Sequence, residues 1–258
     1  MDILGFGITQ ILTFLLVLSR VAGIFTSAPI FGNMNVAKPV RLAIAVALTL
    51  VFLPMAKYNA PTFDFLPFAL ALVKEAFIGI LMGFLASMMF SAIQMAGAFI
   101  DLSMGFGMGQ MVDPMTKEHD AVIGQLQNLT ATMVFLAVNG HHLMIRGLAE
   151  SFAILPLGQM SFGQDSANNI LQMFAGIMLA ALRIAAPVVG AIFLTDVALG
   201  ILNRTVPQLN VFVVGFPVKL AVGLFATVAV LPLSVVVMTN LFGGLHNDLL
   251  VLLKHIRI

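Results

Sequence analysis

The sequence predicts an all-α integral membrane protein built from long, kinked helices. Hydrophobic residues make up 60% of the 258 positions and charged residues only 9%, whereas soluble domains carry about 25% charged residues. The mean hydropathy of +1.08 agrees with this class. Long apolar runs alternate with short polar connectors, which is typical of helices that cross a hydrocarbon layer.

The remaining composition narrows the class of protein. The net charge is +1, so no basic patch indicates a nucleic-acid partner, and cysteine is absent, which excludes disulfides. No positive region precedes the first apolar run, so we expect no cleaved signal peptide. Tryptophan is absent and Tyr58 is the single tyrosine, so the usual aromatic belts are missing. Either much of the apolar surface faces protein, or the composition has simply drifted.

We expect one helix for each apolar run. About 20 apolar residues cross a bilayer, and the runs at 66–100, 170–202 and 211–240 are far longer than this. Such helices tilt, project from the membrane or break, and Pro187, Pro217 and Pro232 provide break points. Residues 245–258 are expected to form a separate short amphipathic helix. The apolar runs cover residues 4–30, 40–56, 66–100, 121–139, 143–157, 170–202 and 211–240.

A polar cluster separates the last two apolar runs, within residues 200–219. Its members include Asn203, Arg204, Gln208 and Asn210. Each unsatisfied polar group in hydrocarbon costs several kcal/mol. We therefore expect the cluster to lie in water, in a cavity or against another chain, and we assign Asn203, Arg204 and Asn210 to assembly.

Six charged residues lie within or beside apolar runs. A charge at the bilayer centre costs about 2.5–3.5 kcal/mol, so these charges either form an ion or proton pathway or pair between helices or subunits. We favour pairing, because the charges are scattered and three positive ones balance three negative ones. Gly79 and Gly83 also form a small-xxx-small pair that lets helices approach closely. The six are Arg20, Glu75, Asp101, Arg183, Asp196 and Lys219.

Residues 104–116 combine glycine with methionine. Alternating glycines disfavour a regular helix, and methionine fills irregular shapes without one fixed packing. The segment therefore suits a pliable seal, and the alternative is a helix end with methionines on a core face. A phosphate-binding loop is rejected, because neither the preceding strand nor the lysine is present. We assign to the seal Gly105, Phe106, Gly107, Met108, Gly109, Met111 and Met115.

No pattern indicates catalysis. His141, His142 and Glu150 lack the spacing of a zinc site, and adjacent histidines do not share a helix face. No serine nucleophile elbow is present, and Asp101 and Asp196 lack the glycine-framed setting of an intramembrane aspartyl pair. We therefore expect a protein that is not an enzyme and has no cofactor or metal.

Taken together, these motifs resemble the family of the flagellar biosynthetic protein FliR, which includes the export-gate T components of virulence type III secretion systems. The similarity extends over essentially the whole chain. The most specific match is the block at 200–219, with Asn203-Arg204, Pro207-Gln208-Leu209-Asn210 and Gly215-x-Pro217-x-Lys219. Looser matches are Arg20 followed by residues 28–32, Pro39-x-Arg41, Glu75 with Gly79 and Gly83-Phe84, residues 97–101, and Asp113-Pro114.

The resemblance implies a structural role in protein export. One FliR-like chain would join several copies of FliP and FliQ in a gate for unfolded flagellar proteins, with FlhB and FlhA in the same apparatus. This gate would lie at the flagellar basal body in the inner membrane, among membrane lipids, and project towards the periplasm. Residues 1–165 would be FliP-like, residues 166–258 a FliQ-like helical hairpin, and the segment from Gly105 to Met115 a channel plug. The alternative is a small-solute or ion transporter that uses the buried charges.

Overall fold

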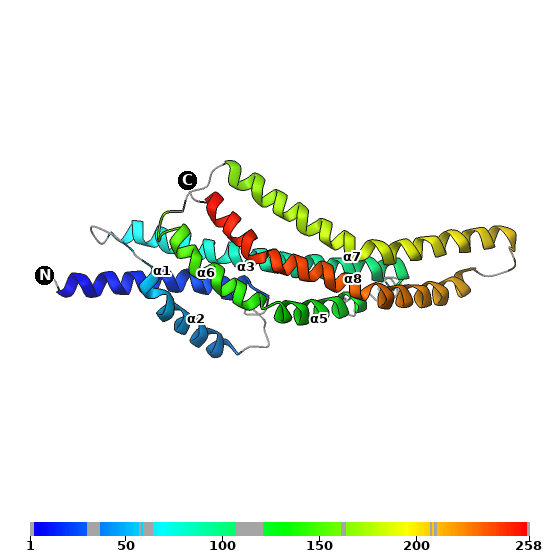
Figure 1. Ribbon diagram of the computed structural model, residues 1–258, viewed down its shortest axis with the longest axis horizontal. Coiled ribbons are helices and arrows are strands. Elements are labelled where there is room, and N and C mark those ends of the chain that lie inside the picture. Colours follow the sequence, from blue (N-terminus) through cyan, green and yellow to red (C-terminus); the bar gives the residue numbers. More distant parts are fainter. Residues whose placement is uncertain are drawn as a thin grey trace. The chain divides into compact units, whose positions relative to one another are not determined.

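The fold is all-α in a computed structural model that describes residues 3–29, 37–56, 58, 64–106, 121–160, 164–206, 208 and 211–256 (Figure 1). Within these ranges there are helices and no strands, which confirms the predicted fold class. Five helices are long and apolar enough to cross a membrane. The elements are α1 (Ile3–Ser27), α2 (Lys38–Phe52), the 3₁₀ helix η1 (Leu53–Met55), α3 (Phe65–Met104), α5 (Val122–Ala137), α6 (Gly140–Ile154), α7 (Gln164–Thr205) and α8 (Val211–Ile256).

Local chemistry explains several helix boundaries. A proline stands in the first turn of α2, where its fixed φ suits a helix start and its missing N–H is not needed. Asn139 links α5 to α6 in the left-handed region, with φ of 55°, which Asn adopts more readily than most residues. Gly105 ends α3 with φ of 93°, and Gly158 turns the chain after α6 with φ of 80°.

The structure decides two points about the last helices, and the expected separate C-terminal helix is wrong. Pro187 lies inside α7, and Pro217 and Pro232 lie inside α8, without ending either helix. Apolar helices tolerate proline where neighbouring groups satisfy the freed carbonyl. Residues 245–256 are also the end of α8 rather than a separate helix, although one face of this segment is apolar. That face is buried and consists of Leu245, Leu249, Leu252, Leu253 and Ile256.

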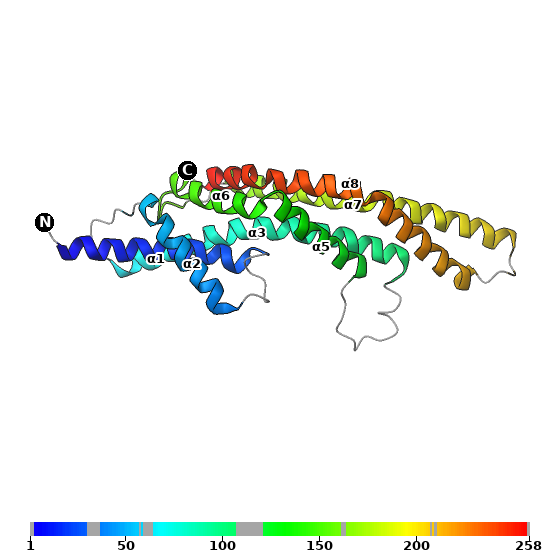
Figure 2. The same ribbon diagram turned by 60° about the horizontal axis from the view of Figure 1, so that its bottom comes forward.

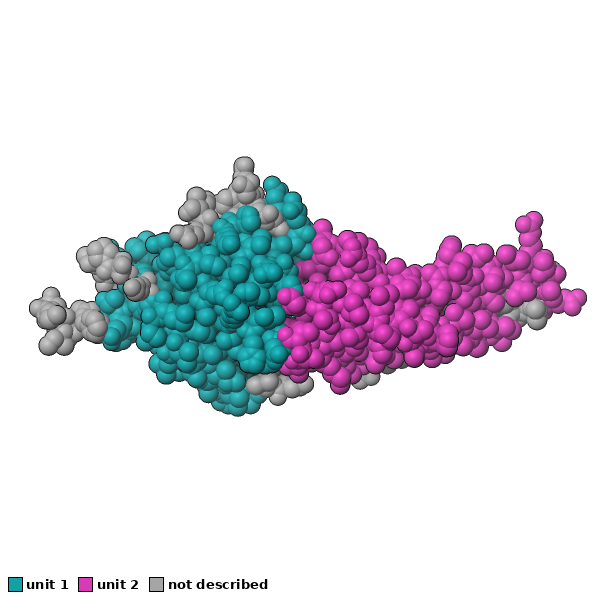
Figure 3. Space-filling model, in the orientation of Figure 1, with its two compact units in different colours: residues 1–88, 139–174, 244–258 teal, residues 89–138, 175–243 magenta. Residues whose placement is uncertain are grey.

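The chain forms two compact units, which Figure 3 colours separately. Unit 1 contains residues 1–88, 139–174 and 244–258, and unit 2 contains residues 89–138 and 175–243. These units are defined by contacts within one chain. The predicted division at residue 165 instead concerns the resemblance of each part to FliP or FliQ. The predicted division therefore stays a prediction.

Each unit has its own apolar core. In unit 1, α1 packs against α2 and, side by side, against α3 (Figures 1 and 2). Gly147 of α6 leaves room for Leu249 of α8 in the same unit. In unit 2, three phenylalanine rings from three helices pack with centroid separations of 5.0–5.4 Å. These are Phe90 of α3, Phe135 of α5 and Phe242 of α8.

Much apolar surface remains uncovered on the membrane-length helices. Only 33% of the apolar window within Ile170–Thr205 is buried in the chain, and only 17% of the window within Val213–Ile256. Soluble monomers rarely expose apolar patches of more than a few hundred Å². The outer faces of α7 and α8 therefore require lipid or other protein chains to cover them.

Candidate functional site

A buried arginine lies at the centre of unit 1. The side chain of Arg20, on α1, is fully buried. Its Nε donates to Oε2 of Glu75 on α3 at 2.6 Å, and its Nη1 donates to Oγ of Ser151 on α6 at 2.9 Å. Nη2 donates to the carbonyl of Leu155 at 3.0 Å, and the guanidinium lies 4.6 Å from the ring centre of Phe152. Every guanidinium nitrogen thus has a partner, as a buried charge requires.

The carboxylate of Glu75 is equally well satisfied. Its Oε1 accepts the N–H of Gly158 at 2.8 Å, while Oε2 serves Arg20. The hydroxyl of Ser151 in turn donates a hydrogen bond to the carbonyl of Leu148 at 2.6 Å. The cluster therefore joins α1, α3, α6 and the turn after α6. Arg20 and Glu75 thus pair between helices of the same chain, and their predicted role in assembly stays a prediction.

Glycines bring α1 and α3 close enough for this pair to form. A Cβ on Gly23 would lie 2.5 Å from the carbonyl oxygen of Ala76, and a Cβ on Gly79 would collide with the backbone of Arg20. A Cβ on Gly83 would collide with Ser27. The predicted small-xxx-small contact is therefore confirmed, and its partner is α1.

In unit 2, Asp101 of α3 caps the N-terminus of α5. Its Oδ2 accepts the N–H of Ile123 at 2.9 Å and that of Gly124 at 3.2 Å, and Oδ1 lies 3.2 Å from the N–H of Ile123. These donors belong to the first turn of α5, where a negative charge also complements the helix dipole. The helices meet closely, because a Cβ on Gly97 would lie 2.7 Å from the amide nitrogen of Gly124.

The backbone of Asp101 also ends α3. Its carbonyl accepts the N–H of Phe106 at 3.1 Å, and the N–H of Gly105 lies 3.2 Å from the carbonyl of Leu102. This is the pattern of a Schellman cap with glycine in the left-handed conformation. Asp101 therefore holds the residues on both sides of segment 107–120, one side by its backbone and the other by its side chain.

The predicted seal falls mostly beyond the described part of the chain. Gly105 and Phe106 form the cap of α3. Met104 is fully buried and packs against Gly223, as the helix-end alternative expected for that one residue. The residues that lie outside the described ranges are Gly107, Met108, Gly109, Met111 and Met115.

The charged and polar residues singled out on α7 and α8 differ in pairing. Asp196 of α7 and Lys219 of α8 form a half-exposed ion pair within unit 2, and their predicted role in assembly stays a prediction. Arg183 is exposed on α7 and has no ion pair among the described residues. Asn203 and Arg204, at the end of α7, are exposed as well, whereas Asn210 lies outside the described ranges.

The structure does not link the charges that a transport relay would need. Across the described residues, no hydrogen bond or ion pair joins any two of Arg20, Asp101, Arg183 and Asp196. The nitrogens of Arg20 are all engaged by Glu75, Ser151 and Leu155. In the described part of the chain, these four groups therefore form no chain of direct hydrogen bonds.

His141 and His142 contact each other rather than Glu150. The rings of His141 and His142 stack with centroids 4.2 Å apart. Glu150 instead pairs with Arg146 at 2.9 Å and approaches Nε2 of His246 at 3.4 Å. The two histidines and Glu150 therefore do not converge on one point.

Comparison with known proteins decides the family. Residues 11–245 match the family described as "Bacterial export proteins, family 1". The chain belongs to this family. Proteins named FliR from several bacteria also match this chain, and the resemblance to the FliR family is confirmed.

Three relatives illustrate the range of the family. The flagellar biosynthetic protein FliR of Bacillus subtilis is 39% identical over 234 residues, which cover 89% of this chain and 90% of the relative. FliR of Escherichia coli is 33% identical over 231 residues, covering 89% and 88%. The Yop proteins translocation protein T of Yersinia pestis is 28% identical over 217 residues, covering 82% and 83%.

Membership of this export family defines the coarse function. The chain is a membrane component of the flagellar and type III export apparatus, and it takes part in flagellum biosynthesis. It is a structural export-gate protein rather than an enzyme. Its membrane-length helices and its family point to the inner membrane.

Sequence reasoning missed several residues of these clusters. Ser151 and Gly158 complete the Arg20–Glu75 cluster, and Gly124 receives Asp101. A serine within an amphipathic helix gives no sign of its distant partner. The turn at Gly158 could have been predicted, because Pro156-Leu157-Gly158 is typical of a turn and glycine is favoured where φ is positive.

Proposed function

We propose that this chain is the FliR subunit of an export gate that it forms with several FliP and FliQ subunits. The observation that carries the proposal is the uncovered apolar surface of α7 and α8, in a chain that belongs to an export family. Exposed Asn203 and Arg204 lie at the end of α7, where polar groups need partners if lipid surrounds them. Neighbouring subunits provide both an apolar cover and hydrogen-bond partners.

Within this gate, the two parts of the chain have different roles. Residues 1–165 are the FliP-like part and residues 166–258 are the FliQ-like hairpin, so one chain closes a ring or helix made of the other two subunits. The gate lies at the flagellar basal body and projects towards the periplasm, with FlhA and FlhB beside it. Unfolded flagellar proteins pass through its channel.

We further propose that the glycine- and methionine-rich segment seals this channel. Flexible thioether side chains adapt to extended chains of different sequence, and glycines allow backbone conformations that other residues disfavour. The seal comprises Gly105, Phe106, Gly107, Met108, Gly109, Met111 and Met115. Gly105 and Phe106 form its base, which Asp101 anchors through the caps of α3 and α5.

Assembly with partner chains is the experimental test. The chain is expressed together with the FliP and FliQ proteins of its own organism, and the purified complex is analysed by native mass spectrometry. Arg204→Leu and Asn203→Leu should prevent incorporation of the chain. Arg146→Leu is the matched control, because Arg146 is exposed on α6 outside the polar cluster. A stable lone chain in a bilayer, or normal incorporation of both hairpin variants, would contradict the proposal.

A further inference from the structure

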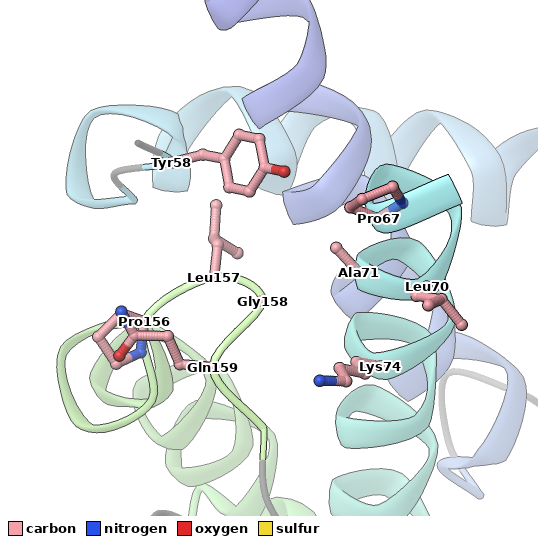
Figure 4. Close-up of a pocket in the computed structure, with 9 residues that line it drawn as sticks. All are labelled: Tyr58, Pro67, Leu70, Ala71, Lys74, Pro156, Leu157, Gly158 and Gln159. Atoms are coloured by element: carbon pink, nitrogen blue, oxygen red, sulfur yellow. The ribbon is translucent and has the colours of Figure 1, made fainter. Parts of the chain in front are cut away.

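A cavity of about 550 Å³ lies in unit 1, between the first turns of α3 and the turn after α6 (Figure 4). A volume of several hundred Å³ is in the range of pockets that bind small molecules. Its wall is mostly apolar, with a few polar groups at defined places. It is lined by Tyr58, Pro67, Leu70, Ala71, Lys74 and residues 156–159.

The polar groups of this cavity favour an anion. Lys74 extends from α3 towards the turn that carries Gly158 and Gln159, as Figure 4 shows. No carboxylate lines the cavity, and Lys74 has no ion pair in the part of the chain that the structure describes. The adjacent Glu75 is committed to Arg20 and to the N–H of Gly158. The positive charge of Lys74 is therefore available to a ligand.

The cavity also has the marks of a membrane–water boundary. Tyr58 is the single tyrosine of a chain without tryptophan, and its ring packs edge-on against Phe68 with centroids 6.5 Å apart. Tyrosine and lysine beside apolar surface are typical of the lipid headgroup level. After Lys74 and Glu75, α3 carries no charge from residue 76 to residue 100. A run of that length exceeds the roughly 20 residues that cross the hydrocarbon core.

An exposed apolar stripe on α3 passes beside the cavity. Its side chains recur three and four positions apart, so they share one face of the helix. Lys74 stands one turn after the stripe residue Leu70. A long acyl chain would cover this face while its headgroup contacts the lysine. The exposed residues of the stripe within unit 1 are Leu66, Leu70, Val73, Phe77, Ile80 and Phe84.

From these observations we propose that the cavity binds one anionic phospholipid. The phosphate contacts Nζ of Lys74, with the hydroxyl of Tyr58 and the amide of Gln159 near the headgroup, and an acyl chain lies along the α3 stripe. Basic pockets beside membrane helices are known to suit such headgroups. This site is independent of which protein subunits surround the chain.

Lipid retention tests the proposal. The chain is extracted from membranes with whatever subunits accompany it, supplied with phosphatidylglycerol or with phosphatidylcholine of the same acyl chains, and analysed by native mass spectrometry. We expect phosphatidylglycerol to be preferred. Lys74→Gln should reduce its retention about fivefold, as expected for one lysine near the lipid surface, and Lys74→Arg should preserve it. Lys254→Gln is the control, because Lys254 is an exposed lysine of unit 1 outside the cavity.

Four results would overturn the proposal. Equal retention of the two lipids, or equal loss in the Lys74→Gln and Lys254→Gln variants, would show that no anionic lipid occupies this cavity. Normal lipid retention by Lys74→Gln together with loss of an accompanying protein would assign the cavity to that protein instead. Inorganic phosphate at millimolar concentration should not displace the lipid, and displacement would contradict the role of the α3 stripe.

Discussion

Oε2 of Glu75 lies 2.6 Å from Nε of Arg20, and neither side chain is accessible to solvent. The two residues come from α1 and α3 and are 55 positions apart in the chain. Because glycines hold these helices at close distance, the pair is shielded from bulk solvent. Substitution of either residue should therefore destabilise unit 1 more than the same substitution at the surface would.

Removing one partner of this pair should strongly destabilise the chain. Arg20→Ala leaves the Glu75 carboxylate buried with only the N–H of Gly158, and an uncompensated buried charge costs about 3–5 kcal/mol. Thermal unfolding of the purified protein in detergent measures the effect. The control is Arg146→Ala, which breaks the exposed pair with Glu150 and should cost at most about 1 kcal/mol. Similar losses of stability in both variants would show that the buried pair contributes no more than the exposed pair.

Adding one methyl group between α1 and α3 should be costly. Gly79→Ala places a Cβ against the backbone of Arg20, which cannot move as a flexible side chain would. Overpacking of this kind costs about 1–3 kcal/mol. Gly176→Ala in α7 is the matched control, because nothing lies within 4 Å of its added Cβ, and alanine favours helix. Unfolding temperatures of the two variants should therefore move in opposite directions.

Loss of the Asp101 carboxylate should loosen the start of α5. Asp101→Ala removes the acceptor for the N–H groups of Ile123 and Gly124, and losing a cap costs about 0.5–2 kcal/mol. Hydrogen exchange at these two amides should become faster, while Asp101→Asn should retain part of the protection. Asp196→Ala removes a different carboxylate of unit 2 and should leave these amides unchanged.

Shortening the glycine- and methionine-rich segment should make the gate leak. The deletion should cover residues 107–111 and keep Gly105 and Phe106, since these two residues cap α3 through the carbonyls of Asp101 and Leu102. The assembled complex should still form, and small solutes should enter the cells faster. Unchanged permeability with an intact complex would contradict the proposed seal.

The helices themselves could be predicted from the sequence, because hydropathy and glycine or proline positions act locally. The predicted apolar runs correspond to the seven described α-helices. Of the alternatives open for the longest runs, a break at proline is not observed, since Pro187, Pro217 and Pro232 remain inside long helices. Proline disrupts the hydrogen bond of one turn, but an apolar environment and packed neighbours keep the rest of the helix intact.

The candidate site was only partly predictable. Charges in apolar runs correctly indicated buried pairing for Arg20 and Glu75, because an unpaired charge there is too costly. The identity of their further partners, Ser151 and Gly158, depends on chain segments far away in sequence. Arg183 had the same sequence signal as Arg20, yet it is exposed on α7.

The sequence by itself determined that this is a helical membrane protein of an export family, because composition and motifs do not depend on how the chain folds back on itself. Only the tertiary structure decided how each charge is neutralised. Arg20 finds Ser151 131 positions away, and Asp101 meets the start of α5 only because Gly97 and Gly124 let two helices touch. Hydrogen bonds form only at donor–acceptor distances of about 3 Å, and the energy of an ion pair depends on its separation and burial, so both depend on distances that local sequence patterns do not contain.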